Sequence, residues 1–473
     1  MLPLSRIAAT GMLAGVLVQM AGCATPAPQA PMKPSSRPVT WEEASRIEQG
    51  AVEMSSDPAA AWWLALHDPT LKQLLSQARF ASVEQALARV DEAQALLGQQ
   101  RAGTRPQLSG GVQAQRGLEQ NGVPQLVSRA GPSLQFGWEI DLWGRQSHPT
   151  QAAARRAVQR EAESRLALLL AQTQVAELVH QERACRQQGA LLAAEASSWT
   201  RTLTLQRERL RVGALSEQGM ARIESQAAAQ SAQLAQTLGQ CRALRQALRA
   251  LTGLTPDALD AALQKEPPTW ERPPVLKPEQ PAALLLQHPQ MQAAAAAADA
   301  AQQDLAGARA AGLPSLNLSA LLSHQWLRVM GQGSELNPWS MGMGLMGSLV
   351  DGGAGHARSE AAHARWRAAL ASLEQTLRQT VRDIETAVAQ QDAAQRHWGA
   401  TQRRAEAAAR AWQASQSASD AGRLNGLDLE EAARQRSAAD MALTLSQRDL
   451  TLAWIAVIKA TGQAPLQLEP GSP

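Results

Sequence analysis

The sequence repeats itself, and this duplication constrains the fold more than any other feature. Four landmarks recur in the same order at an offset of about 209 residues, which is too long a period for a solenoid repeat. The first-copy landmarks are residues 101–108, 138–141, 213–216 and 251–253, and their counterparts are residues 309–316, 348–351, 422–425 and 460–462. We therefore divide the 473-residue chain into two structural repeats, 45–253 and 282–463, joined by a proline-rich linker at 254–281.

Each repeat opens with a helical run that stops at a proline. In the first repeat, apolar residues between Leu71 and Leu97 fall on one helical face, and the run ends before Pro106. In the second repeat, the alanine-rich run at 290–311 has a high helix propensity and ends before Pro314.

Two segments with strand periodicity follow in each repeat. Apolar and polar residues alternate at 134–142, 316–320 and 339–347, and a weaker, glycine-rich candidate spans 107–115. These strands have roughly the ten-residue length that a membrane barrel uses. Four strands cannot close a barrel alone, so such a chain must oligomerise to cover its sheet edges.

Each repeat ends in a very long helical hairpin. The expected helices cover residues 151 to about 211 and 217 to about 251, then 359 to about 421 and 428 to about 460. A helix of 60 residues would run ~90 Å, which is longer than an ordinary globular domain. Helices of this length are stable when they pack against others of similar length. The sequence thus predicts a mainly α protein with a small sheet.

The N-terminus is predicted to be a processing signal. Arg6 and the apolar run that follows it make residues 1–22 a signal peptide. Small residues precede Cys23, which resembles the lipobox of bacterial lipoproteins, where the cysteine becomes the lipidated first residue. Residues 23–44 would form the lipid-anchored tether, and residues 464–473 a C-terminal tail. The alternative is an ordinary secretory signal whose cleavage site happens to contain a cysteine.

The composition argues against several classes of function. The 45 basic and 42 acidic residues leave a net charge of +3, and no basic stretch is interleaved with aromatic residues, so we expect no nucleic-acid partner. The 13 Trp, 2 Phe and absent Tyr are few for an enzyme of this size. No nucleophile motif or metal-ligand spacing is present, so we expect no enzyme activity, no cofactor and no metal site.

The landmarks together resemble the outer-membrane efflux (TolC-like) family, and specifically its lipoprotein branch of drug-efflux channels. The resemblance covers about residue 45 to residue 463. It is carried by residues 62–63, 68–69, 138–145 and 349–353, and by the two glycine-containing hairpin tips. Of these, the run Trp-Glu-Ile-Asp-Leu-Trp-Gly-Arg at 138–145 is the most specific.

The resemblance implies a concrete architecture. Three copies would form one tunnel, with four strands from each subunit completing a 12-stranded barrel in the outer membrane. The antiparallel coiled-coil helices would extend into the periplasm, where a periplasmic adaptor protein and an inner-membrane pump dock at the tips. The channel would be a passive exit duct for small molecules or drugs in a tripartite efflux system, anchored by lipid to the cell outer membrane.

The resemblance also supplies candidate residues at the tips. When the family's motif glycine is matched to Gly422, Asp428 and Glu431 fall where similar channels carry acidic residues around the aperture. Six carboxylates from three subunits would favour cations. The alternative is that Asp428 only caps the returning helix. Gly213 and Gly422 are expected to permit tight turns.

Cys185 and Cys241 are the two remaining cysteines. Their midpoint is residue 213, at the first tip, so antiparallel helices meeting there would bring them close together. The periplasm is oxidising, which favours a disulfide. Two buried free thiols remain the alternative.

Two other functions stay open from the sequence. One is the outer-membrane channel of a type I protein-secretion system. The other is a lipid-anchored periplasmic coiled-coil scaffold that forms no pore, although such a scaffold would have no use for alternating strands.

Overall fold

The structure is a computed structural model that describes residues 42, 52–55, 62–121, 123–265, 270–278, 281–329 and 332–465. The expected signal peptide at 1–22, the lipidated Cys23, nearly all of the tether and residues 466–473 of the tail lie outside the described residues.

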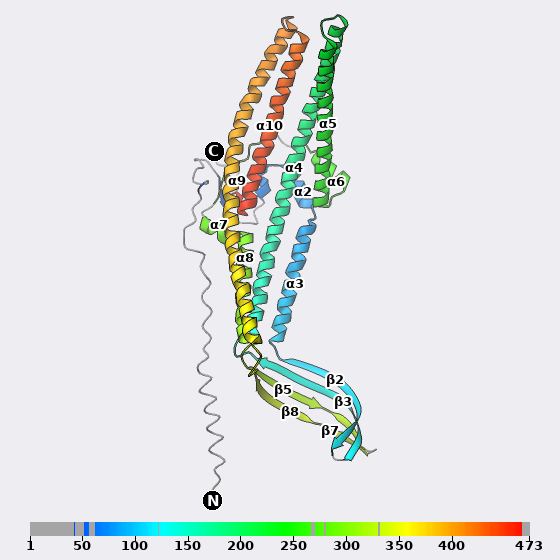
Figure 1. Ribbon diagram of the computed structural model, residues 1–473, viewed down its shortest axis with the longest axis vertical. Coiled ribbons are helices and arrows are strands. Elements are labelled where there is room, and N and C mark those ends of the chain that lie inside the picture. The colour runs from blue at the N-terminus through cyan, green and yellow to red at the C-terminus, as the bar shows by residue number, and fades with distance from the viewer. Residues whose placement is uncertain are drawn as a thin grey trace.

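Two long antiparallel hairpins dominate the molecule and place their tips at the same end (Figure 1). The first pairs α4 (Ser147–Arg211) with α5 (Glu217–Thr252), and the second pairs α9 (Ala354–Asp420) with α10 (Gly426–Thr461). Helix α4 has 65 residues and α9 has 67, so each runs about 100 Å. The expected mainly α fold with very long helices is confirmed.

Shorter helices complete the bundle beside the long ones. Helix α3 (Ala81–Gly103) packs on α4, and α8 (Pro289–Ala310) lies between α4 and α9 in the half nearer the sheet. In the half nearer the tips, α10 packs against both α4 and α9. The remaining helices of the described residues are η3 (Trp62–Leu66), α2 (Pro69–Gln77), α6 (Pro256–Leu263) and α7 (Pro281–Gln287).

None of the helices in the described part of the chain is both long enough and apolar enough to cross a membrane.

The main sheet lies at the end opposite the tips (Figure 1). Its order is β7-β6-β3-β5-β8. Strands β5 and β6 pair with successive parts of one edge of β3, and β2 pairs with the opposite edge of β3. The strands are β2 (Gln107–Asn121), β3 (Val123–Ile140), β5 (Ser315–Ser323), β6 (Gln325–Val329), β7 (Gln332–Leu336) and β8 (Trp339–Met346). Among the described residues, the strands of one chain form an open sheet that does not close on itself.

Strands β2, β3 and β5 are longer than the alternation indicated, whereas β8 ends one residue before the predicted 347. The second repeat contributes four segments instead of two. Strands β6 and β7, which the alternation did not predict, continue the paths of β5 and β8 beyond a break. At that break the amide of His324 donates to the carbonyl of Pro132, and the amide of Ser323 donates to that of Pro338, both at 3.0 Å. The register with β3 continues through the break, from Leu322 opposite Leu134 to Trp326 opposite Ala130. Beyond it, the apolar and polar positions are partly exchanged, with Arg328 on the apolar face and Leu327 on the polar face, so the alternation could not be followed.

The register gives the main sheet one apolar and one polar face, because paired residues project on the same side. The apolar face includes Leu108, Val112, Leu134, Phe136, Trp138, Leu316, Leu318, Met341, Met343 and Leu345. The polar face includes Gln107, Ser109, Gln113, Gln135, Glu139, Asn317, Ser319 and Ser340. Many of the apolar side chains are exposed in the single chain, including Val112 and Met343.

The hydrophobic core sits at the middle of the bundle, in a region we call the waist. There Trp62 packs against Trp454 of α10, with ring centroids 6.1 Å apart, and α2, α4 and α6 contribute further buried residues. A small sheet of order β4-β1-β9 lies here, formed by Leu276–Lys277, Val52–Ser55 and Ala464–Pro465. The waist therefore joins segments from the start, middle and end of the chain.

Candidate functional site: the hairpin tips and the waist

Both tips turn on a glycine in the left-handed region. Gly213 has a φ of +74° and Gly422 a φ of +69°. Three residues after each helix end, a backbone amide donates back to a carbonyl of the last helical turn, from Ala214 to Arg209 and from Arg423 to Ala418, both at 2.8 Å. A side chain at either glycine would strain this backbone, which explains the residue type that the sequence marked.

The returning helices begin with capping side chains. Ser216 accepts a hydrogen bond from the amide of Gly219 at 3.1 Å, and Asn425 accepts one from the amide of Asp428 at 2.9 Å. The amide nitrogen of the Asn425 side chain also donates to the Asp428 carboxylate at 2.7 Å. The idea that Asp428 caps helix α10 is therefore wrong, because Asn425 is the cap and Asp428 supports it from the third helical position.

The two candidate carboxylates lie on one side of α10. Asp428 is exposed, and Glu431 follows one turn later with its side chain 56% exposed. Arg434 bonds the Glu431 carboxylate at 2.9 Å, and this bond holds the pKa of Glu431 below its usual value. Gly219, the first-repeat counterpart of Asp428, brings no carboxylate to the other tip.

A clasp between α10 and α4 lies close behind the second tip. Arg201 of α4 donates to both carboxylate oxygens of Glu430, at 2.5 and 2.9 Å. Burial raises the pKa of Glu430, but the Arg201 bonds outweigh it and the pKa is lowered. Sequence reasoning missed this pair because its members are separated by 229 residues.

Arg434 strengthens the same clasp. Its guanidinium donates to Ser198 at 3.2 Å and to Thr202 at 3.0 Å, and it lies 4.4 Å from the ring centroid of Trp199. Because all three partners are on α4, the start of the second returning helix is held against the first hairpin.

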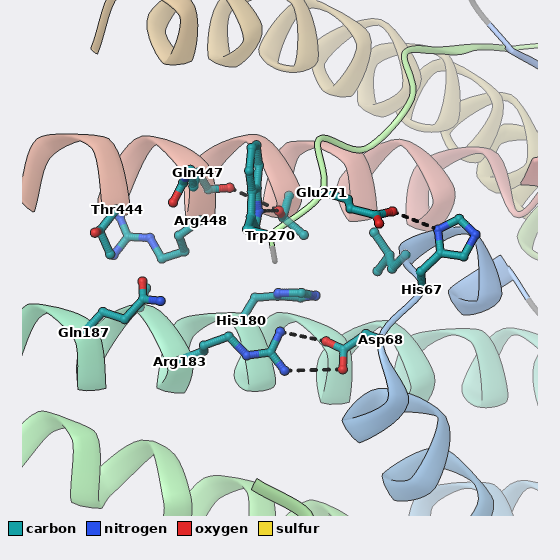
Figure 2. A pocket seen from close by; sticks show the side chains of 13 residues that line it. His67, Asp68, His180, Arg183, Gln187, Trp270, Glu271, Thr444, Gln447 and Arg448 are labelled. Carbon is teal, nitrogen blue, oxygen red and sulfur yellow. Dashed lines mark hydrogen bonds and ion pairs between the residues drawn. The ribbon is translucent and has the colours of Figure 1, made fainter. Parts of the chain in front are cut away.

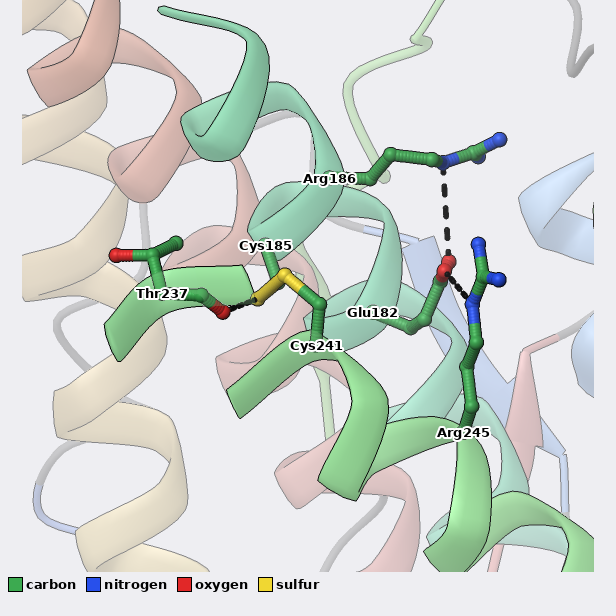
Figure 3. The surroundings of a disulfide bond; sticks show 6 residues. All are labelled: Glu182, Cys185, Arg186, Thr237, Cys241 and Arg245. Carbon is green, nitrogen blue, oxygen red and sulfur yellow. Dashed lines mark hydrogen bonds and ion pairs between the residues drawn. A yellow bond between two sulfur atoms is a disulfide. The ribbon is translucent and has the colours of Figure 1, made fainter. Parts of the chain in front are cut away.

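The first hairpin is closed by a covalent bond (Figure 3). Cys185 of α4 and Cys241 of α5 form a disulfide, with Cα atoms 5.6 Å apart. One turn away, the buried carboxylate of Glu182 accepts a hydrogen bond from Arg245 at 2.9 Å. Together these contacts tie α5 to α4, with the two cysteines 28 residues before and after the tip glycine Gly213.

The waist holds a buried ionic cluster (Figure 2). Asp68 caps α2 by accepting from the amides of Thr70 and Leu71, and Arg183 of α4 donates to both of its carboxylate oxygens at 2.7 and 3.3 Å. Burial raises the pKa of Asp68, but the Arg183 interactions outweigh it and the pKa is lowered. This contact is the structural reason for the Asp-Pro landmark at 68–69.

His180 lies beside this ion pair without a hydrogen-bond partner for its Nε2 atom among the described residues. Burial, followed by the nearby charge of Arg183, lowers its pKa to about 4, so the ring is neutral at neutral pH. The hollow it faces is only 90 Å³. No group of three or more potential metal ligands occurs in the described part of the chain.

Tryptophans and aspartates fix the junction between sheet and helices. Trp138 donates to the carbonyl of Thr104 at 3.1 Å, and Trp143 donates to that of Pro314 at 2.9 Å. Asp141 accepts from the amide of Ser147 at the start of α4, and Asp351 accepts from two glycine amides at the start of α9. The most specific sequence landmark is thus the segment that connects the strands to the long helices.

Comparisons with known proteins agree with this geometry. The family model described as outer membrane efflux protein matches residues 72–254 and again residues 281–463. The fusaric acid resistance protein FusA of Burkholderia cepacia is 28% identical over 374 residues, which cover 73% of this chain and 67% of that protein.

Solved structures share the fold. The CmeC outer membrane channel of Campylobacter jejuni superposes with a TM-score of 0.79 at 18% identity, covering 92% of this chain and 94% of that one. The outer membrane protein VceC of Vibrio cholerae gives a TM-score of 0.72 at 24% identity, covering 86% and 99%.

Proposed function

Because the chain belongs to the outer membrane efflux protein family, we propose that it is the passive outer-membrane duct of a tripartite efflux system. The observation that carries this proposal is the join between a two-faced sheet and helices about 100 Å long. Substrates would enter among the helices and leave through the sheet without chemical change. A periplasmic adaptor and an inner-membrane pump would supply cargo and energy.

The open sheet supports a homotrimer. Strand β2 forms one edge and β7 with β8 forms the other, and both edges present unpaired backbone groups to solvent. In three copies, β2 of one subunit would pair with β8 of the next, which gives a closed 12-stranded barrel. Apolar side chains would then face lipid while the polar face lines a water-filled passage. A scaffold without a pore would have no use for this division of faces.

The tips would form the periplasmic aperture. Gly213 and Gly422 set the two turns, and Asp428 and Glu431 of three subunits would gather six carboxylates around the entrance. Lipidation of Cys23 would anchor each subunit to the outer membrane. The FusA relative is named for fusaric acid resistance, which favours small-molecule efflux over protein secretion.

Paired cysteines across the proposed subunit contact test the assembly. Gln113 of β2 and Ser340, Gly342 or Gly344 of β8 all project on the polar face, so we would replace Gln113 and one β8 residue by cysteine in each variant. Oxidation should give a ladder ending at covalent trimers on a denaturing gel. A ladder that ends at dimers, or monomers in every variant of the membrane-inserted protein, would contradict the trimer.

A charge substitution tests the aperture. Asp428→Asn should lower the preference for cations over anions in bilayer recordings, since neutralising a ring of carboxylates weakens the local field. Asp420→Asn, at the end of α9 beside the same tip, is the matched control and should change the preference less. Equal effects of the two substitutions would remove Asp428 from the aperture.

A further inference from the structure

Two arginines interrupt the apolar face of the main sheet. Arg116 on β2 and Arg328 on β6 both lie opposite Ser128 of β3, so the three side chains form one row on the same face. Both arginines are exposed, and neither has an ion-pair partner among the residues that the structure describes. Two guanidinium groups without an ion pair, on a face that is mainly apolar, need an explanation.

Their position along the strands fits the edge of a membrane. The apolar side chains of β3 begin at Ile140, next to the helices, and the Arg116 row is reached at Ser128. Twelve residues of strand cover about 40 Å, and a tilt of about 40° reduces this to a height of about 30 Å. This height matches the hydrocarbon core of a bilayer, which is about 30 Å thick.

The free-energy cost of exposing arginine to lipid supports the same placement of Arg116 and Arg328. An arginine that faces lipid strongly destabilises a barrel when it lies at the bilayer midplane, whereas the cost falls nearly to zero near the interface. The row formed by Arg116 and Arg328 is therefore compatible with the headgroup region farthest from the helices. In the proposed channel, this region is the outer leaflet.

The surface between the arginines is hollowed. Small residues of this face line the hollow, and they are Ala114, Ser128, Ala130 and Gly333. Its volume is 650 Å³, and Trp326 and Glu335 lie together in the adjacent row. The guanidinium groups of Arg116 and Arg328 and the carboxylate of Glu335 together leave a formal charge of +1. The backbones of Arg116 and Arg328 are two strand spacings apart, which is roughly 10 Å. This spacing allows their long side chains to converge on one anionic group.

We propose that Arg116 and Arg328 hold the anionic phosphate headgroup of an outer-leaflet lipid above Ser128, with its acyl chains along the apolar face. This inference rests on the proposed function, because it requires the sheet to span the membrane. Arginine suits this task, since its planar fork donates two hydrogen bonds to one phosphate. Trp326 supplies an amphipathic ring beside the headgroup.

A third arginine in the region provides a contrast. Arg129 neighbours Ser128 in the chain, so its side chain projects on the polar face, where it is bonded to Glu119 at 2.7 Å. It has the same charge at the same height, but it is neutralised within the chain and faces away from lipid. Arg129→Gln is therefore a matched control.

The test is a competition in nanodiscs that contain phosphatidylcholine and lipid A, a glycolipid with two phosphate groups. Native mass spectrometry would count the lipid A that the purified full chain retains after release from the discs. The double substitution Arg116→Gln with Arg328→Gln should reduce retention about ten-fold, since two charge-assisted hydrogen-bond donors are lost. Arg129→Gln should change retention less than about two-fold, and the double substitution to lysine should restore part of it.

Three results would overturn the inference. These are unchanged retention in the double glutamine variant, an equal loss in Arg129→Gln, and displacement of lipid A by inorganic phosphate alone, which would indicate a phosphate site without a lipid. Conductance of the same samples separates this inference from the proposed function. A chain that conducts without preferring lipid A keeps the channel and loses the lipid site, whereas a chain that does not insert contradicts the channel itself.

Discussion

Residue 182 in the first repeat is a buried glutamate, and its counterpart in the second repeat, residue 391, is a buried glutamine. Glu182 bonds the Arg245 side chain, whereas Gln391 both accepts from and donates to the backbone of Leu276, at 3.2 and 3.1 Å. The same position in the fold is thus stabilised by an ion pair in one repeat and by neutral hydrogen bonds in the other.

The two hairpins differ in the same way. The first is tied by a disulfide, while the counterparts of its cysteines in the second repeat are Ala394 and Leu450. The second hairpin relies on a buried hydroxyl contact between Thr401 and Ser446 and on the clasp to α4 near its tip. What the two repeats share is backbone geometry, including left-handed glycines at the tips and at the ends of α5 and α10. The duplicated fold therefore depends on its turns and caps, whereas the side-chain contacts that hold each hairpin together differ between the two repeats.

The largest expected effect follows from removing the disulfide. Cys185→Ala with Cys241→Ala opens a loop with a sequence separation of 56 residues. The chain-entropy model gives a loss of about 4 kcal/mol for a loop of this size. Hydrogen exchange should show lower protection in α5 and little change in α10. Equal loss of protection in both helices would show that the two hairpins are not stabilised independently.

Acidification should weaken the waist through His180. Its pKa is about 4 in the folded chain and 6.5 in an ordinary environment, so between these pH values the unfolded chain binds a proton that the folded chain does not. Stability should therefore fall by ~3 kcal/mol as the pH drops from 6.5 toward 4. Asp68, whose pKa is lowered, adds a further loss as the pH falls through its folded value.

His180→Gln tests the origin of this pH dependence. The slope of unfolding free energy against pH should decrease in this variant, as measured by denaturant unfolding at several pH values. It should not vanish, because burial also lowers the pKa of His288 in the second repeat. A slope identical to that of the native chain would show that the waist cluster does not control acid stability.

The tip glycines should respond alike, since their backbone geometry is the same in both repeats. Gly213→Ala and Gly422→Ala should each cost about 1 kcal/mol, because alanine is strained at a φ near +70°. Gly239→Ala, inside α5 with open space around it, is the control and should be neutral or stabilising. Thermal unfolding would compare the three variants, and a cost at only one tip would show that the turns are not equivalent.

The smallest expected effect concerns the clasp behind the second tip. Arg201 has 55% of its side chain exposed, so its pairing with Glu430 should contribute only about 0.5 kcal/mol. A double-mutant cycle with Arg201→Ala and Glu430→Ala would measure this coupling. The interchange of the two residues should restore part of it, and a coupling of zero would remove the pair from the clasp.

Much of the fold was predictable because it depends on local patterns. Helix propensity, the terminating prolines and the tip glycines fixed the long helices to within a few residues, with α4 starting at Ser147 instead of residue 151. The period of two located the strands up to the break at His324. The waist was not predictable, because Asp68 meets a partner 115 residues away and β4 and β9 are only two residues long.

Some of the candidate site residues could also be predicted from local sequence, whereas others could not. The pairing of Cys185 with Cys241 could be predicted from their midpoint at Gly213, since an antiparallel hairpin pairs residues symmetrically. Gly422 could be located as the counterpart of Gly213 in the second repeat. Asn425 could have been recognised as a cap from its place three residues before Asp428, which is the spacing of a capping box. The clasp contacts of Arg201 and Arg434 could not be predicted from local sequence, because their partners across the clasp lie in the other repeat.

The account depends most on one claim, that the polar face of the main sheet lines a water-filled passage. Single-channel recording of the purified, lipidated protein in planar bilayers tests it most directly, using the neighbouring variants Gln135→Cys on the polar face and Leu134→Cys on the apolar face. The account predicts discrete conductance steps that a charged, thiol-reactive reagent reduces in Gln135→Cys and leaves unchanged in Leu134→Cys. Reduction in Leu134→Cys alone, or no conductance from membrane-inserted protein, would contradict it.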